Sequence, residues 1–312
     1  MSKLESVGQD VTLIDGYDLD LPNRTGSYII QDEALTVIET SASPSVPFLI
    51  EGLEAIGEAP ENVKHIIVTH VHLDHAGGVG LLLQSCPNAT VHVHPRGKRH
   101  LADPTKLVQG ARAVYGEQFD ELFDPVLPVP EDRLIEQSDG SELAIGSRTL
   151  TFYDTPGHAK HHLSIHDSKA NAIYTGDTIG VYYPHLLPYG ETFVLPSTSP
   201  NQFDPEAMLE SLRRIETLEV DAIHFGHFGR SSEPQVVYEQ MRDWLPIFLE
   251  LSEEAMKRES DHQVGAVHQA LFERVAAHLD ALGVARDDEV YQLLEMDMSV
   301  CALGLVDYLK KT

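Results

Sequence analysis

Three imidazoles and one carboxylate fall within the six positions from His70 to His75, directly after the apolar run Ile66–Val68. Such a run predicts a buried strand, and a loop at a strand end can aim several side chains at one point. Imidazole nitrogen and carboxylate oxygen are ligands that suit zinc and its first-row neighbours. The segment therefore predicts a metal-binding loop, against the alternative of a histidine-rich turn on the surface.

Three further segments each end an apolar or β-rich run at a glycine and present one acid or imidazole. They are Asp154–His158, Tyr174–Thr178 and His224–Gly229. A pair of metal ions needs more ligands than one loop supplies, and these segments contain the residue types that would complete two metal shells. The four segments together therefore predict a site for metal ions.

In this order and at these spacings, the motifs resemble the metallo-β-lactamase superfamily of metallohydrolases, closest in pattern to its glyoxalase II-like branch. The resemblance extends from about Val11 to about Gly229. It implies an α/β fold, an αββα sandwich in which two packed mixed β-sheets are flanked by helices. It also implies two sets of ligands, namely His70, His72 and His158 for the first metal and Asp74, His75 and His227 for the second, with Asp177 bridging the two.

The chemistry of such a site does not need a protein nucleophile. Two cations about 3.5–4 Å apart can share a water molecule, lower its pKa towards about 7 and polarise the carbonyl or phosphoryl oxygen that it attacks. Asp74 is predicted to have a second, catalytic role, in which its carboxylate holds the attacking water and steers a proton to the leaving group. Two divalent ions per chain are expected, with Zn²⁺ as the first choice and iron or manganese as alternatives.

One position departs from the family pattern. The family usually reads Gly-His-x-x-Gly-His, whereas here His161 occupies the place of the second glycine and His162 keeps its usual place. We predict that His162 orients a ligand or a carboxylate by hydrogen bonding, the alternative being a plain buried polar residue. For His161, a contact with the pocket, a more distant supporting role and solvent exposure all stay open. A ligand role is not expected because both shells are filled.

Most of the 17 histidines are expected to have no functional role. His92 and His94 alternate with valines, and this period of two predicts a half-exposed strand with both imidazoles on one face. His185 and His224 lie nearer the predicted site in sequence and are weaker candidates for contact with substrate.

The loop after Asp177 is the best indication of substrate class. From Tyr182 to Phe193 it is rich in aromatic and apolar residues and has few charges, which suits an acyl or otherwise neutral organic group. Tyr182 and Tyr183 are candidate hydroxyl donors to a developing oxyanion. The alternative is that these aromatic side chains only fill the core.

Acidic residues outnumber basic ones by 49 to 22, which gives a net charge of -27. A surface of that sign repels nucleic-acid phosphates and anionic lipid headgroups, so neither is an expected partner.

No apolar run approaches the roughly 18 residues of a membrane span, and the amino terminus lacks the pattern of a secretory signal. A cytoplasmic protein is expected. Cys86 and Cys301 have no metal-ligand spacing and are interpreted as packing residues in a reducing compartment.

The resemblance implies a metallo-β-lactamase-like catalytic domain over residues 1–231, and the hydrophobic pattern predicts a helical extension over residues 232–312. In the extension, Pro246 is expected to kink one helix and Gly283 to separate the last two. The extension could pack on its own domain, cap the site or form a homodimer. Strands are predicted at 11–15, 27–31, 35–39, 133–136, 142–145, 150–154, 163–166, 172–175 and 222–225, and helices at 44–56, 78–83, 103–115 and 204–218.

Three functions are compatible with these features. The leading one is hydrolysis of a small-molecule ester, thioester or lactone at a dinuclear site. A phosphodiester or phosphonate hydrolase would need cations near the pocket, and only Lys160 and Arg230 are close to it in sequence. The third is an oxidoreductase with a single iron, similar to the sulfur dioxygenases of the superfamily. Flavodiiron proteins are disfavoured because His72 stands where they have glutamate.

Overall fold

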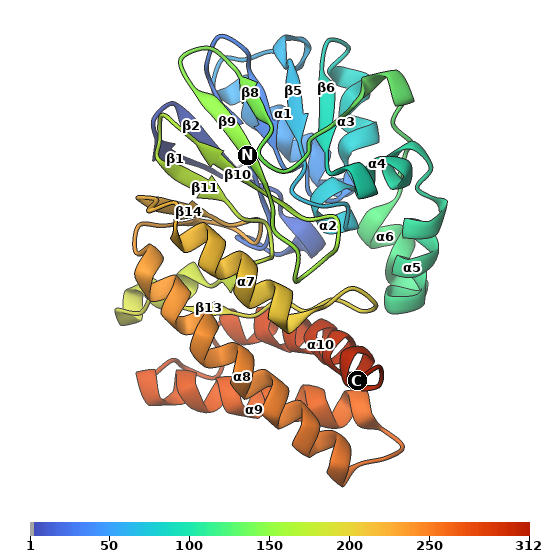
Figure 1. The fold of residues 1–312 in the computed structure, drawn as a ribbon, viewed down its shortest axis with the longest axis vertical. Coiled ribbons are helices and arrows are strands. Elements are labelled where there is room, and N and C mark those ends of the chain that lie inside the picture. Colours follow the sequence, from blue (N-terminus) through green and yellow to red (C-terminus); the bar gives the residue numbers. More distant parts are fainter. Residues whose placement is uncertain (1–2) are drawn as a thin grey trace. The chain divides into compact units, whose positions relative to one another are not determined.

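The structure is a computed structural model that describes residues 3–312, and the chain divides into two compact units. Unit 1 comprises Met1–Asp154, His161–Gly176 and Val220–Ser232, and unit 2 comprises Thr155–Lys160, Asp177–Glu219 and Glu233–Thr312. The predicted fold class is confirmed, since two mixed sheets flanked by helices are followed by a C-terminal helical extension (Figure 1). Among the helices of the described chain, none has the length and apolar character needed to cross a bilayer.

The first sheet of unit 1 has seven strands in sequence order. Its strands pair antiparallel from β1 to β4 and parallel from β4 to β7. A parallel pair needs a long crossover connection, and for this reason helices separate the later strands along the chain. The strands are β1 (Leu4–Gly8), β2 (Val11–Asp15), β3 (Gly26–Ile30), β4 (Thr36–Ile38), β5 (His65–Ile67), β6 (Thr90–Val93) and β7 (Leu134–Glu136).

The second sheet of unit 1 has six strands in the order β15-β14-β11-β10-β9-β8. Only β11 and β14 pair in parallel, and the other neighbours are antiparallel. Its strands are β8 (Glu142–Ala144), β9 (Thr149–Asp154), β10 (Leu163–Asp167), β11 (Ala172–Tyr174), β14 (Ala222–His224) and β15 (Arg230–Ser231).

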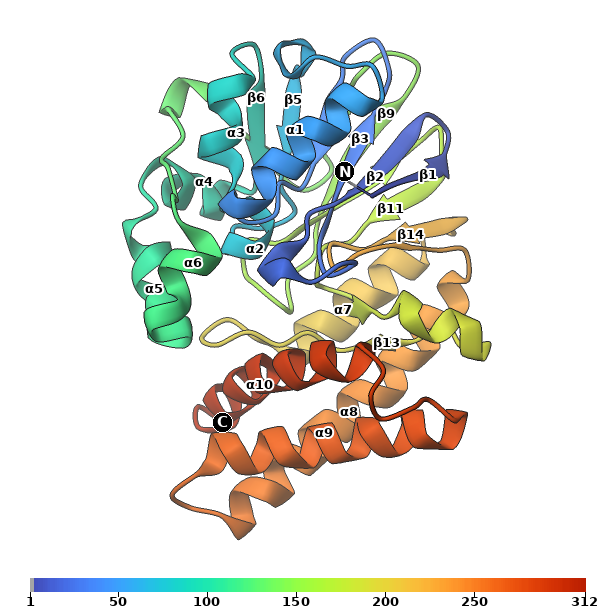
Figure 2. The ribbon, with the colours of Figure 1, turned by 180° about the vertical axis from the view of Figure 1, so that it is seen from behind.

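The central strands of the first sheet, β2 to β6, are buried on both faces, because their apolar residues alternate between two cores. In β5, Ile66 belongs to the core formed with helices α1 (Val46–Ala55) and α3 (Val79–Ser85), whereas Ile67 belongs to the core between the two sheets. Figure 2 shows α1 and α3 on the helical face of this sheet. A slip of one residue would exchange the two faces, so this double burial fixes the register of the strand.

The remaining helices of unit 1 follow the strands of the parallel half. Just before α5, Asp103 Oδ1 accepts a hydrogen bond from the Thr105 amide at 3.1 Å. The helices are α2 (Leu73–Ala76), α4 (Pro95–Ala102), α5 (Thr105–Tyr115) and α6 (Phe119–Phe123).

Unit 2 contains the helical extension, in which α8, α9 and α10 pack on one another. Gly283 ends α9 with a φ of 81°, as predicted for a glycine stop, while α8 continues through Pro246. The separate helical domain stays a prediction, because unit 2 also includes Thr155–Lys160 and Asp177–Glu219. Its elements are β12 (Val181–Tyr182), the 3-10 helix η6 (Pro184–Tyr189), β13 (Val194–Leu195), α7 (Pro205–Glu216), α8 (Pro234–Arg258), α9 (Gln263–Leu282) and α10 (Val290–Leu309).

The expectation of a half-exposed strand at His92 and His94 was wrong, since both side chains are buried. His92 Nε2 lies 3.0 Å from His65 Nδ1, and Gln137 Nε2 lies 2.8 Å from His92 Nδ1. His94 caps α4 by accepting a hydrogen bond from a backbone amide of its first turn. The period of two located β6 correctly. It could not show that β6 lies inside the sheet with both of its faces covered.

The burial of His92 predicts a dependence of stability on pH. Burial lowers the pKa of His92 from 6.5 to about 3, and His65 adds to this effect. The unfolded chain therefore takes up a proton at higher pH than the folded chain, and stability should fall as the pH decreases from 6.5 towards 3. In His92→Gln, the free energy of unfolding measured with urea should decrease less steeply over this range than in the wild type.

The matched control is His262→Gln, because His262 is exposed in the linker before α9. This variant should keep the wild-type slope. Equal slopes for His92→Gln and the wild type would show that His92 does not contribute to the acid sensitivity.

Candidate metal site

The predicted metal loop directly follows β5. After Ile67 the chain turns into the single helical turn α2. His70 and His75 are buried, and His72 and Asp74 are partly buried. His70 Nε2 lies 3.0 Å from His72 Nδ1. The loop is therefore not a histidine-rich turn on the surface.

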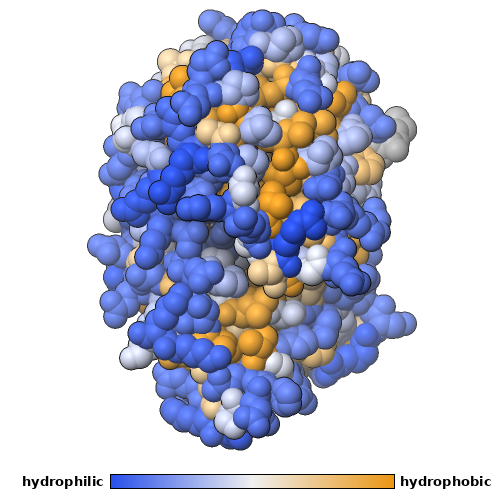
Figure 3. Space-filling model, turned by 90° about the vertical axis from the view of Figure 1, so that its right-hand side faces the viewer, coloured by the Kyte–Doolittle hydropathy of each residue, from blue (hydrophilic) through white to orange (hydrophobic). Residues whose placement is uncertain are grey.

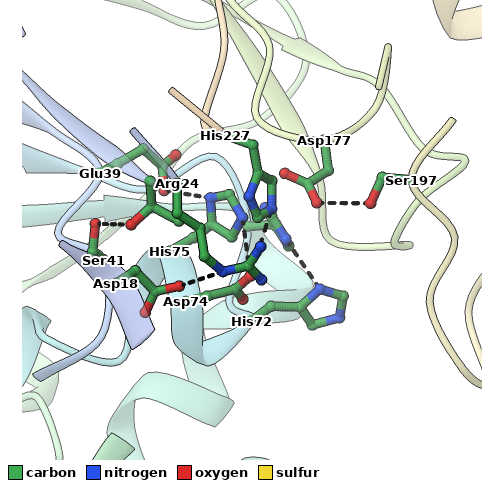
Figure 4. A network of polar contacts seen from close by, with 12 residues as sticks. Asp18, Arg24, Glu39, Ser41, His72, Asp74, His75, Asp177, Ser197 and His227 are labelled. Atoms are coloured by element: carbon green, nitrogen blue, oxygen red, sulfur yellow. Dashed lines mark hydrogen bonds and ion pairs between the residues drawn. The ribbon is translucent and has the colours of Figure 1, made fainter. Parts of the chain in front are cut away.

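Asp74, His75 and His227 converge within unit 1 (Figure 4). Asp74 Oδ2 lies 3.7 Å from His75 Nε2 and 3.6 Å from His227 Nε2, and one ligand atom from each residue lies within 4.8 Å of the other two. Two ligands bound to a tetrahedral ion at about 2.0–2.1 Å are about 3.3 Å apart. Both the donor atoms and their spacing fit a divalent cation.

Glu39 holds this cluster from the end of β4. Its Oε1 accepts a hydrogen bond from the Thr69 amide at 2.8 Å, and its Oε2 lies 3.1 Å from His75 Nδ1. The contact with Glu39 favours a proton on His75 Nδ1 and leaves Nε2 as the ligand atom. Glu39 has a φ of 65°, a backbone conformation that non-glycine residues seldom adopt. Sequence reasoning missed this role, although an acid at the end of a buried strand was a usable signal.

His70 is positioned by Thr69 and by His162. Thr69 Oγ1 lies 3.0 Å from His70 Nδ1, and the His162 ring stacks on the His70 ring with 5.0 Å between centroids. Gly176 permits this arrangement, because a Cβ there would lie 2.4 Å from Thr69 Oγ1 and 2.6 Å from His162 Nε2. His162 therefore touches a predicted ligand, while its predicted hydrogen-bonding role stays a prediction.

His161 is buried beside the same cluster. Its ring centroid lies 6.3 Å from that of His70, with the rings nearly parallel, and 5.6 Å from that of His72, with the rings nearly perpendicular. Only 4% of His161 is exposed. Of the three alternatives that the sequence left open, solvent exposure is therefore wrong.

A buried ion pair on the loop between β2 and β3 was not predicted. Arg24 Nε donates to Asp18 Oδ2 at 3.1 Å. Burial raises the pKa of Asp18 to about 6, Arg24 opposes this rise, and the charge of Asp74 adds to it. The Asp15 carboxylate holds this loop by accepting hydrogen bonds from two backbone amides of the loop. The segment has no apolar periodicity, so the sequence contained no signal for this contact.

His158 and Asp177, the two predicted ligands of unit 2, face one another. His158 Nε2 lies 3.6 Å from Asp177 Oδ2, which again fits two ligands of one cation. Ser197 contacts both residues: its hydroxyl donates to Asp177 Oδ2 at 3.0 Å, and its carbonyl oxygen lies 3.1 Å from His158 Nδ1. No sequence motif pointed to Ser197.

Tyr182 and Tyr183 are both buried in unit 2. The Tyr183 hydroxyl donates to Asp297 Oδ2 on α10 at 2.8 Å. Its proton is thus engaged in a contact that holds α10.

The other singled-out histidines and the cysteines have packing or ion-pair partners. His224 stacks on Tyr174 with 4.8 Å between ring centroids, and burial lowers its pKa to about 3. His185 Nε2 lies 3.8 Å from Glu289 Oε1. Burial raises the pKa of the Cys86 and Cys301 thiols to about 12, as expected for packing residues.

Comparison with known proteins identifies the family. The model of the metallo-beta-lactamase superfamily matches residues 22–227, and the chain belongs to that superfamily. Members of the superfamily are largely metal-dependent hydrolases, and some are oxidoreductases. The predicted glyoxalase II-like branch stays a prediction.

The relatives differ in how much of their length is matched. The metallo-beta-lactamase fold-containing protein of Sulfurisphaera tokodaii is 28% identical over 231 residues, which are 73% of this chain and 81% of the relative. The putative diflavin flavoprotein A 1 of Nostoc is 22% identical over 305 residues, which are 89% of this chain and 48% of the relative. An archaeal metallo-beta-lactamase superfamily protein from Sulfolobus tokodaii has a similar structure, with a TM-score of 0.67, 21% identity and coverage of 98% of this chain and 100% of that chain. This likeness shows the fold.

The contact between Glu39 and His75 leads to a prediction about metal affinity. In Glu39→Gln, the side-chain oxygen can still accept from the Thr69 amide, but an NH₂ group then faces His75 Nδ1. This donor favours the tautomer with its proton on Nε2, the atom that faces Asp74. We expect zinc affinity to fall about 10–100-fold, measured by competition with a chromophoric chelator.

Glu54→Gln is the matched control, because Glu54 is exposed on α1. It should bind zinc like the wild type. Unchanged zinc affinity in Glu39→Gln would rule out the orienting role of Glu39.

Proposed function

We propose that this chain is a dinuclear metallohydrolase that cleaves an ester, thioester or lactone of a small organic molecule. The observation that carries the proposal is the convergence of Asp74, His75 and His227 on one point of unit 1. Burying imidazole and carboxylate groups together is costly unless a cation or hydrogen bonds compensate them. A bound divalent cation supplies that compensation.

The proposed ligand set follows the motif order of the family. His70, His72 and His158 hold one ion, Asp74, His75 and His227 hold the other, and Asp177 bridges them. This nitrogen-rich set suits Zn²⁺, with iron or manganese as alternatives. Support comes from the spacing of the Asp74 carboxylate to its two histidines and from the contact of Glu39 with His75.

Asp74 is proposed to act in the reaction as well as in binding. Divalent cations at this site would act as Lewis acids that polarise the acyl carbonyl and make water nucleophilic near neutral pH. The Asp74 side chain is 22% exposed, against 1% for His75, so its carboxylate can meet solvent and substrate. It can accept a proton from the attacking water and pass that proton to the leaving group.

The composition of the loop after Asp177 supports a neutral acyl group as the part of the substrate that the enzyme recognises. From Tyr182 to Phe193 this loop is rich in aromatic and apolar residues and has few charges, and such a lining favours organic ligands of low charge. Tyr182 and Tyr183 are both proposed as candidates for the donor to the developing oxyanion.

The substrate is proposed to be a small molecule and not a nucleic acid or a membrane lipid. The net charge of -27 opposes binding of polyanions. The face of the molecule drawn in Figure 3 is largely hydrophilic, and its apolar residues form groups among the hydrophilic ones. A cytoplasmic location fits the two buried, free cysteines. A homodimer formed through the helical extension remains part of the proposal.

An oxidoreductase is the second candidate, because the chain resembles a diflavin flavoprotein over 89% of its length. His72 argues against a flavodiiron protein, since those proteins have glutamate at that position, but it does not argue against an oxidoreductase with a single iron, similar to the sulfur dioxygenases of the superfamily. Elemental analysis separates the two candidates: a single tightly held iron, with no second site filled under excess zinc, would favour the oxidoreductase.

Replacing Asp74 tests the proposed function. In Asp74→Ala, we expect the histidine-rich first site to retain its metal, so metal content should fall by about half. Turnover should fall at least about a hundredfold, because the same residue acts as ligand and proton acceptor. The measurement is the rate on the best substrate from a panel of esters, thioesters, lactones and phosphodiesters, together with metal content.

Asp287→Ala is the control, because Asp287 is exposed in the turn before α10. This variant should keep both metal and rate. A near wild-type rate in Asp74→Ala would remove Asp74 from the mechanism. A wild-type enzyme active only on phosphodiesters would overturn the proposed substrate class.

A further inference from the structure

Ser197 links the two proposed ligands of unit 2 through its side chain and its backbone. The hydroxyl donates to Asp177 Oδ2 at 3.0 Å, and the carbonyl oxygen lies 3.1 Å from His158 Nδ1. A carbonyl oxygen only accepts, so His158 must carry its proton on Nδ1 to make this bond. The lone pair is then on Nε2, the atom that faces Asp177.

The backbone on both sides of Ser197 is attached to helix α10. Thr198 Oγ1 donates to the Cys301 carbonyl oxygen at 2.8 Å, and Cys301 Sγ lies 3.4 Å from the Pro196 carbonyl oxygen. Gly304 brings the helix still closer: a Cβ there would lie 2.6 Å from Thr198 Oγ1 and 2.8 Å from the Ser199 amide nitrogen. A close contact of this kind is possible only for glycine.

Further contacts between α10 and the rest of unit 2 strengthen this attachment. The Asn201 amide donates to Asp307 Oδ2 at 2.8 Å, and the Tyr183 hydroxyl donates to Asp297 Oδ2. Thr198 is fully buried and Ser197 is 8% exposed. Solvent therefore cannot readily replace the contacts that α10 makes, and the position of Ser197 depends on the helix.

We infer that α10 is a supporting element of the metal site, with Ser197 as the positioning residue and Gly304 as the residue that sets the distance. Movement of the helix shifts segment 196–199, and this segment orients the His158 imidazole and the Asp177 carboxylate. The inference rests on the proposed function, because it assigns His158 and Asp177 to metal binding. The competing view is that α10 only packs against segment 196–199.

Three variants test whether α10 supports the metal site through segment 196–199, and each variant changes a different contact. Ser197→Ala removes the hydroxyl that donates to Asp177 and leaves the backbone carbonyl. Thr198→Val removes the hydrogen bond to α10 with little change of shape. Gly304→Ala adds a single Cβ that pushes the helix away. The control is Gly265→Ala on α9, where a Cβ would meet nothing within 4 Å.

The experiment is a titration of metal-free protein with Co²⁺, followed by its visible absorption spectrum and by the melting temperature without metal. We expect Co²⁺ affinity to fall about tenfold or more in all three variants, with a changed spectrum. Gly265→Ala should match the wild type in affinity and spectrum. The spectrum reports ligand geometry, which a change of packing alone would not alter.

Wild-type Co²⁺ affinity and spectrum in Ser197→Ala and Thr198→Val would overturn the inference, whatever the behaviour of Gly304→Ala. If Gly304→Ala does not fold, those two variants still decide the question, because neither adds bulk. The proposed function fails in a different way: wild-type protein that binds no Co²⁺ would contradict the metal site itself.

Discussion

The proposed metal site depends first on the buried carboxylate of Glu39. Its oxygens meet the Thr69 amide at 2.8 Å and His75 Nδ1 at 3.1 Å, and without such partners a buried carboxylate would be strongly unfavourable. Glu39 directly follows β4 and Thr69 lies two residues after β5, and these strands pair in parallel. The sheet therefore sets the distance between them. A slip of one residue between β4 and β5 would turn Glu39 away from the metal loop, so the register that buries the strands also builds the site.

The inferred support of the metal site gives the helical extension a functional role. Within unit 2, α10 holds segment 196–199 through Thr198 and through the close approach at Gly304. That segment contacts both His158 and Asp177 through Ser197. Orienting contacts of this kind determine which nitrogen of a histidine is available to a metal. On this inference, a helix far along the chain from every proposed ligand supports metal binding without contributing a ligand.

The fold class and the proposed ligands could be predicted from the sequence because their signals are local. His70, His72, Asp74 and His75 lie within six positions, and apolar runs locate the strands that precede the ligands. His162 was predicted as an orienting residue from its place in the motif, and an acid at the end of a buried strand was a signal for Glu39, but the contact partners of the orienting residues are not local in the sequence. The contact of Glu39 with His75 requires knowing that β4 and β5 are neighbours, and the pairing of Arg24 with Asp18 depends on the shape of an irregular loop. The burial of His92 likewise follows from strand order, which the alternation of residues in one strand does not reveal.

The central claim is that this chain binds two divalent cations with the ligands that its family pattern implies. The most direct test is a crystal structure of the zinc-loaded protein with anomalous diffraction recorded on both sides of the zinc absorption edge. Two anomalous peaks are predicted, one bound by Asp74, His75 and His227 and the other by His70, His72 and His158, with Asp177 contacting both. A single peak, or peaks bound by other residues, would contradict the account.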